Sequence, residues 1–93
     1  MYIIKARENL DSMNIHRVHI KVDMPEKMPH EKLKAVAQKI VKDTIAHEKC
    51  NTIAIDFGPY GYVDFAPYGN WLRISNRLPN NYNNYRFKYI FFD

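Results

Sequence analysis

A single cysteine, Cys50, occurs among the 93 residues, so the chain cannot form an internal disulfide. Small secreted domains usually depend on several disulfides, and the scarcity of cysteine therefore favours a reducing compartment. The N-terminal apolar run, Tyr2 to Ile4, ends at Lys5, whereas a signal peptide needs roughly 7–15 apolar residues. No segment approaches the ~18 apolar residues that span a bilayer. We therefore predict a cytoplasmic protein with no membrane partner.

Motifs that carry catalysis are also missing. The sequence has no Ser-His-Asp order, no glycine-rich phosphate loop and no dinucleotide-binding fingerprint. The four histidines are scattered, and His16 and His19 lie three positions apart on a predicted strand, so they face opposite sides. A zinc site needs three or four converging nitrogen or sulfur ligands. We predict a non-enzymatic protein without a metal or other cofactor, in which Cys50 is an unreactive thiol at a helix–strand junction.

The composition that is present is that of a small globular domain. Hydrophobic residues make up 46% of the chain and charged residues 26%, which is typical of a folded protein rather than a disordered one. We find no linker, so residues 1–93 are expected to form one domain. The net charge of +4 is compatible with nucleic acid or an acidic protein surface as a partner.

Periodicity predicts one long helix and several strands. Residues 15–23 alternate between apolar and polar side chains, which is typical of a strand with one buried face. Residues 29–48 predict an amphipathic helix that begins at Pro29. Its apolar stripe consists of Leu33, Val36, Ala37, Ile40, Val41, Thr44 and Ile45.

Further strands are expected at residues 2–7, 52–57, 71–76 and 86–92. A strand–helix–strand succession predicts that residues 15–23 and 52–57 pair in parallel, and the last three strands should form an antiparallel meander. The expected fold class is α+β: a two-layer sandwich with one long amphipathic helix on a four- or five-stranded mixed sheet, in the order β-β-α-β-β-β.

A repeated loop is expected between residues 56 and 69. Asp56-Phe57-Gly58-Pro59-Tyr60-Gly61 recurs as Asp64-Phe65-Ala66-Pro67-Tyr68-Gly69, and Pro-Tyr-Gly is a turn sequence. Between the repeats, Tyr62 and Val63 are expected to form a short hairpin arm. Asp56 and Asp64 could approach each other and bind Mg²⁺ or divide acid and base roles. We favour the alternative, in which the aspartates cap turns.

Tyrosines in predicted loops suggest a protein-binding surface. Tyrosine is enriched at interfaces because it brings contact area and a hydroxyl group at low entropic cost. The candidate protein-binding residues are Tyr60, Tyr62, Tyr68, Tyr82 and Tyr85. The alternative is that some of these rings fold back and cover a small core.

The C-terminal third suggests nucleic acid as a second kind of partner. Trp71 and Arg73 share one face of a predicted strand, and Arg86 and Lys88 share one face of another. If these faces coincide, the ring can stack on a base while the cations hold phosphate. The plain alternative is a solvated sheet face, with Phe87, Tyr89 and Phe91 in the core.

One family resemblance spans roughly residues 15–92. The segment Glu31 to Ile40, the segment Thr52 to Phe57, and Trp71 before a late strand together resemble a small uncharacterised domain of putative lipoproteins in Gram-positive bacteria. This sequence departs from that pattern at Leu72, where the family has alanine, and it lacks a lipoprotein signal. The resemblance supports the α+β fold and implies no activity.

These observations lead to a functional hypothesis with one alternative. We expect a small non-enzymatic protein-binding domain whose partner is another protein. The abundance of Lys, Ile, Asn and Tyr suits an AT-rich bacterial genome or its phage, and an inhibitor of a host enzyme or defence system is the specific prediction. The alternative is a domain that binds single-stranded nucleic acid on a basic and aromatic sheet face.

Overall fold

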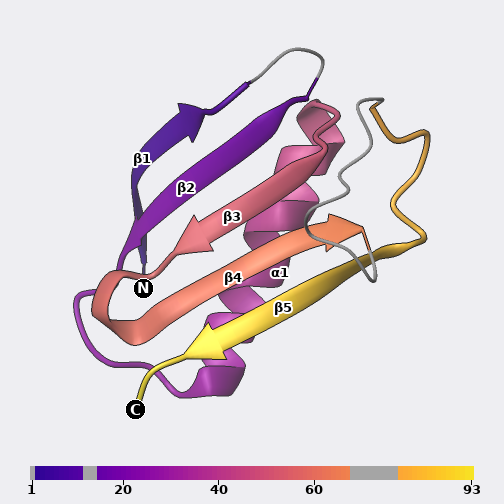
Figure 1. The fold of residues 1–93 in the computed structure, drawn as a ribbon. Helices are drawn as coiled ribbons and strands as arrows, with labels where there is room; N and C mark the ends of the chain where they lie inside the picture. The colour runs from indigo at the N-terminus through magenta and orange to yellow at the C-terminus, as the bar shows by residue number, and fades with distance from the viewer. Residues whose placement is uncertain (1, 12–14, 68–77) are drawn as a thin grey trace.

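The structure is a computed structural model that describes residues 2–11, 15–67 and 78–93. A five-stranded sheet lies against a single α-helix within these ranges (Figure 1). In chain order the elements are β1 (Ile3–Asn9), β2 (Arg17–Asp23), α1 (His30–His47), β3 (Thr52–Asp56), the 3-10 turn η1 (Gly58–Tyr60), β4 (Gly61–Pro67) and β5 (Tyr85–Phe91). The predicted α+β fold class, one helix on a mixed sheet, is confirmed.

The strands lie in the sheet in the order in which they occur in the chain, β1-β2-β3-β4-β5. β2 and β3 are parallel, with Val18 opposite Ile53 and Ile20 opposite Ile55. The other three pairs are antiparallel. The predicted parallel pair is thus confirmed, and α1 is the connection that makes it possible, since parallel strands need a crossover.

The predicted apolar stripe of the helix is the side that packs on the sheet. Leu33, Ala37, Ile40, Val41 and Thr44 are buried. They face alternate residues of the three central strands, where every second side chain points to the helix. The buried strand residues include Val18, Ile20, Val22, Ile53, Ile55, Val63 and Phe65. Thr44 is accommodated because its hydroxyl group donates to the carbonyl of Ile40, at 2.7 Å.

The N-terminal half of the helix also makes side-chain contacts with β5. The His30 ring lies 5.0 Å from the Phe91 ring. Gln38 Nε2 donates to the Tyr89 hydroxyl group at 2.9 Å, and Lys34 Nζ lies 5.1 Å from the centre of the Tyr89 ring. A helix about 10 Å wide cannot cover five strands spaced about 4.8 Å apart. β1, at the opposite edge, is therefore left largely exposed.

The predicted loop over residues 56–69 is wrong in its second half. Residues Gly61–Pro67 form a full strand, β4, which pairs with both β3 and β5. Gly61, Val63 and Phe65 are buried on it, whereas Tyr62 is exposed. Only the first Pro-Tyr-Gly is a turn among the described residues, as η1. The strand predicted over residues 71–76 lies outside the described residues.

Candidate functional site

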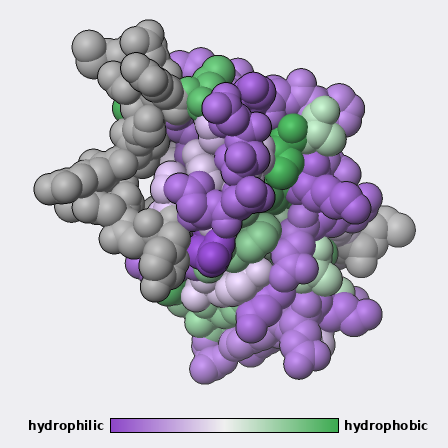
Figure 2. Space-filling view, turned by 90° about the vertical axis from the view of Figure 1, so that its right-hand side faces the viewer, coloured by the Kyte–Doolittle hydropathy of each residue, from purple (hydrophilic) through white to green (hydrophobic). Residues whose placement is uncertain are grey.

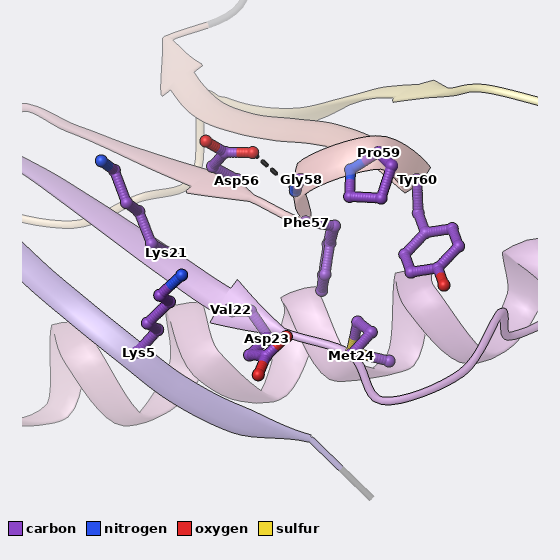
Figure 3. A pocket seen from close by; sticks show the side chains of 10 residues that line it. All are labelled: Lys5, Lys21, Val22, Asp23, Met24, Asp56, Phe57, Gly58, Pro59 and Tyr60. Atoms are coloured by element: carbon purple, nitrogen blue, oxygen red, sulfur yellow. Dashed lines mark hydrogen bonds between the residues drawn. The ribbon is translucent and has the colours of Figure 1, made fainter.

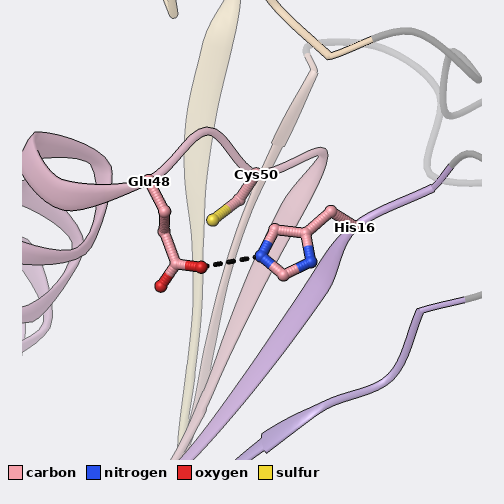
Figure 4. A group of neighbouring side chains, drawn as sticks. All are labelled: His16, Glu48 and Cys50. Atoms are coloured by element: carbon pink, nitrogen blue, oxygen red, sulfur yellow. Dashed lines mark hydrogen bonds and ion pairs between the residues drawn. The ribbon is translucent and has the colours of Figure 1, made fainter.

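Three potential metal-ligating side chains meet where β2 and β3 begin. His16 directly precedes β2, Glu48 directly follows α1, and Cys50 precedes β3 by two residues. The His16 ring nitrogen, the Glu48 carboxylate and the Cys50 sulfur each offer an atom, and these atoms lie within 4.8 Å of one another. Figure 4 shows the three side chains pointing into a common space. We call this group the His16 cluster.

Hydrogen bonds fix both nitrogens of the His16 ring. Nδ1 lies 2.6 Å from Asp11 Oδ1, and Nε2 lies 2.8 Å from Glu48 Oε2. The second oxygen of Glu48, Oε1, forms an ion pair with the Arg7 guanidinium group. A chain of polar contacts thus runs from Asp11 through His16 and Glu48 to Arg7 on β1.

The environment of Cys50 disfavours a nucleophilic thiol. The residue is 0% exposed, and burial raises the pKa of its thiol, against a smaller lowering by Arg7. Reactive cysteines need the thiolate, which a lowered pKa supplies. Burial therefore favours the thiol form of Cys50, which is less nucleophilic than the thiolate.

Two of the predicted protein-binding tyrosines form hydrogen bonds with the backbone of the segment between α1 and β3. The Tyr82 hydroxyl group accepts from the Cys50 N–H at 3.0 Å, and the Tyr85 hydroxyl group donates to the Asn51 carbonyl at 2.8 Å. Tyr85 was predicted to lie in a loop, but it opens β5 and is only 8% exposed. Both rings pack on Phe65. The alternative, in which such rings fold back over a small core, holds for this pair.

The other two described tyrosines, Tyr60 and Tyr62, lie in different environments. Tyr60 belongs to η1 and packs partly against the core. Tyr62 was predicted to lie in a short hairpin arm, but it lies within β4, is exposed, and meets the Phe92 ring edge-on. Tyr68 lies outside the described residues. The four described tyrosines are thus divided among the core, a turn and the exposed face of the sheet.

An apolar groove lies instead between β1 and α1, on the side of the sheet that carries the helix. It has a volume of about 190 Å³. Ile20 and Ile40 are the buried apolar residues among its lining, and Tyr2 and Ile4 line it from the N-terminal segment. Ile4 is 50% exposed. Its polar lining residues are Arg7, Asp43, Thr44 and His47. We call this feature the β1–α1 groove.

One side of the molecule has a largely polar surface. Figure 2 views the side that is on the right in Figure 1, and hydrophobic residues appear on it as small areas between polar ones. Isolated exposed apolar residues are ordinary on protein surfaces, whereas apolar residues gathered in a concave site suggest binding. The β1–α1 groove is therefore the stronger candidate for recognition.

Arg86 and Lys88 lie on the face of the sheet that is turned away from the helix, as the nucleic-acid hypothesis requires. Both are exposed, and they alternate with Phe87 and Tyr89, which pack against the core. Lys88 lies opposite Asp64 in the pairing of β4 and β5, so this face carries both signs of charge. Burial raises the pKa of Asp64, and Lys88 lowers it less strongly. Trp71 and Arg73 lie outside the described residues.

The two repeated aspartates occupy different positions and have different partners. Asp56 accepts a hydrogen bond from the Gly58 N–H at 2.7 Å, which is the turn-capping role that we favoured. It pairs in register with Tyr62, whereas Asp64 pairs with Ala54. Figure 3 shows Asp56 beside a pocket of about 290 Å³, with Lys5 and Lys21 at one end. Asp23 also lines this pocket, so its charge is mixed.

Comparisons with protein-family models, curated proteins and solved structures gave no match for this chain. The resemblance to a lipoprotein domain therefore stays a prediction. Within the described residues, no helix is long and apolar enough to cross a membrane.

Sequence reasoning missed the His16 cluster because it looked for several histidines rather than one. Asp11 and His16 lie more than thirty positions before Glu48 and Cys50 in the chain, and the four match no spacing motif. A usable signal did exist. Adjacent parallel strands begin at the same end of a sheet, so residues near the starts of the two predicted strands, such as His16 and Cys50, are expected to lie close together.

Proposed function

We propose that this protein is a non-enzymatic binding domain that takes an apolar segment of another protein into the β1–α1 groove. The observation that carries the proposal is the position of Ile4. It is half exposed in a concave site whose other apolar members, Ile20 and Ile40, belong to the core. A partner side chain placed there would extend the core without rearranging it.

The architecture gives a physical reason for such a site. The N-terminal half of α1 packs towards β5, through His30, Lys34 and Gln38, and β1 at the other edge is left largely exposed. Each apolar side chain that a partner buries in the groove contributes about 1.5–3 kcal/mol before the costs of association. Arg7, Asp43 and His47 at the groove provide polar and charged groups of both signs, as in the polar rim of an interface.

The edge position of β1 supports the same proposal. β1 has one neighbour among the described strands, β2, and an edge strand offers unpaired backbone groups to an extended peptide. Pairing is irregular between Ile4 and Ala6, and such bulges restrict indiscriminate pairing of sheet edges. The partner that fits is an extended segment with an apolar side chain beside its backbone. Inhibition of a host enzyme or defence system would be one use of this binding, and it stays a prediction.

Affinity capture with a matched pair of variants tests the proposal. The bait is the wild-type protein, Ile4→Lys, or Leu78→Lys, in a bacterial lysate and in a random-peptide display library. Leu78 is exposed to a similar extent, 46%, but does not line the groove. We expect Ile4→Lys to lose the captured partners and Leu78→Lys to keep them. Partners that Ile4→Lys retains at wild-type level would contradict the proposal.

A further inference from the structure

A neutral His16 ring cannot donate a hydrogen bond to both of its partners. Both of its ring nitrogens face carboxylate oxygens, Asp11 Oδ1 at 2.6 Å and Glu48 Oε2 at 2.8 Å. An ionised carboxylate only accepts hydrogen bonds, and a neutral imidazole has one N–H donor and one lone pair. With Nδ1–H donating to Asp11, the Nε2 lone pair faces Glu48. A positive centre, either a proton or a metal ion, is therefore needed between Nε2 and Glu48.

The position of Cys50 favours a metal ion over a proton between His16 and Glu48. Its sulfur lies within 4.8 Å of the same His16 and Glu48 atoms (Figure 4). Nitrogen, sulfur and carboxylate oxygen are the ligands that Zn²⁺ takes in proteins. A proton between His16 and Glu48 would use two of these three groups, whereas a metal ion would use all three.

Neighbouring groups orient the three side chains through hydrogen bonds and an ion pair, as such partners orient the ligands of metal sites. Asp11 accepts from Nδ1 of His16, and a carboxylate in this place fixes the tautomer that leaves Nε2 free to bind a metal. Arg7 engages only Oε1 of Glu48 and leaves Oε2 directed at His16. The backbone of Cys50 is anchored by Tyr82. These constraints reduce the ordering that metal binding would otherwise require.

We propose that His16 Nε2, a carboxylate oxygen of Glu48 and the Cys50 sulfur bind one Zn²⁺ ion, with a fourth position open to water or to a partner's side chain. Binding forms a zinc–sulfur, a zinc–nitrogen and a zinc–oxygen bond. It releases the thiol proton of Cys50 and any proton on Nε2 to solvent, and no group changes its oxidation state. The Glu48 and Cys50 anions then balance the charge of the ion.

Cobalt provides a direct spectroscopic probe of this site. Titration of the full chain with Co²⁺ should reach one ion per chain and produce a thiolate-to-cobalt charge-transfer band in the near ultraviolet. Zn²⁺ should then displace Co²⁺ and abolish the band. Cys50→Ser, which is close in volume, should remove the band and keep the circular dichroism of the fold.

Two further variants separate the ligands from their surroundings. Asp11→Asn keeps all three ligands but weakens the orienting hydrogen bond, and affinity should fall about 10–100-fold. His30→Gln, at the exposed first residue of α1 and outside the cluster, should bind as the wild type does. The proposal is overturned if no charge-transfer band forms, if Cys50→Ser retains the band, or if His30→Gln loses affinity as much as Asp11→Asn. In each case the His16 cluster would be a proton-bridged polar contact only.

Discussion

His16 and Asn51 bind each other through reciprocal hydrogen bonds, although they lie 35 positions apart in the chain. The His16 N–H donates to Asn51 Oδ1 at 2.7 Å, and the Asn51 N–H donates to the His16 carbonyl at 2.8 Å. This pair closes the parallel β2–β3 ladder at its first residues. It also sets the distance between the segments that carry His16 and Cys50.

Asn51→Ala should therefore destabilise the protein. Asn51 is 1% exposed, and its removal leaves the His16 N–H without its side-chain acceptor, which costs about 1–3 kcal/mol. Chemical denaturation should show a lower midpoint with an unchanged slope. Asn9→Ala, on exposed β1, is the control and should stay within about 0.5 kcal/mol of the wild type. Equal stability of the two variants would contradict the importance of this pair.

The two described turn glycines should differ in their tolerance of a side chain. Gly61 has φ +128°, and a Cβ there would collide with the Ile90 carbonyl and lie 2.8 Å from the Phe91 Cα. Gly58 has φ +63° with nothing within 4 Å of a Cβ. Gly58→Ala should cost about 1–2 kcal/mol. Gly61→Ala should cost more, because backbone strain of about 1–3 kcal/mol is joined by a collision with β5.

Thermal melting of the two alanine variants gives the comparison. A Gly61→Ala protein as stable as Gly58→Ala would mean that β4 and β5 do not approach as closely at Gly61 as the register of Gly61 with Phe91 requires.

Tyr85 should make stability fall at alkaline pH. Burial raises its pKa from the ordinary 10.0 to about 12. Between these values the unfolded chain loses the phenol proton while the folded chain keeps it, so the free energy of unfolding decreases as pH rises. The contribution is fully present below pH 10. Tyr85→Phe should show a shallower decline across this range, measured by denaturation at a series of pH values.

The same variant should also be less stable at neutral pH, by about 1–3 kcal/mol, because it leaves the Asn51 carbonyl without the Tyr85 donor. Some decline should remain in Tyr85→Phe, since burial also raises the pKa values of Tyr82 and Cys50. Identical pH dependence in the two proteins would show that Tyr85 is not buried as described.

The helix, β2 and β3 could be predicted because local pattern and final environment agree. The stripe from Leu33 to Ile45 has helical spacing, and Val18, Ile20 and Val22 alternate as a half-buried strand does. Each pattern arises because one face of the element is buried, so the sequence shows directly which type of element forms. The predicted helix ends are each within one residue of those observed.

β4 was missed because turn residues masked its alternation. Gly61, Val63 and Phe65 are buried at alternate positions. The two Pro-Tyr-Gly sequences at the ends of this segment nevertheless predicted turns. Which residues are exposed was harder to predict than the strands, because exposure depends on where other elements pack. Ile4 is exposed because α1 packs towards β5, and Tyr85 is buried because Phe65 and Asn51 lie beside it. Neither relationship has a local signal in the sequence.

The proposed binding in the β1–α1 groove is tested most directly by methyl NMR of two adjacent isoleucines. Ile3 and Ile4 are both exposed on β1, but successive strand residues point to opposite faces, and only Ile4 lines the groove. When a captured partner is added, we expect the Ile4 methyl resonances to shift and to become protected from a soluble paramagnetic probe, and those of Ile3 to change less. Protection of Ile3 with Ile4 unaffected would contradict the proposal.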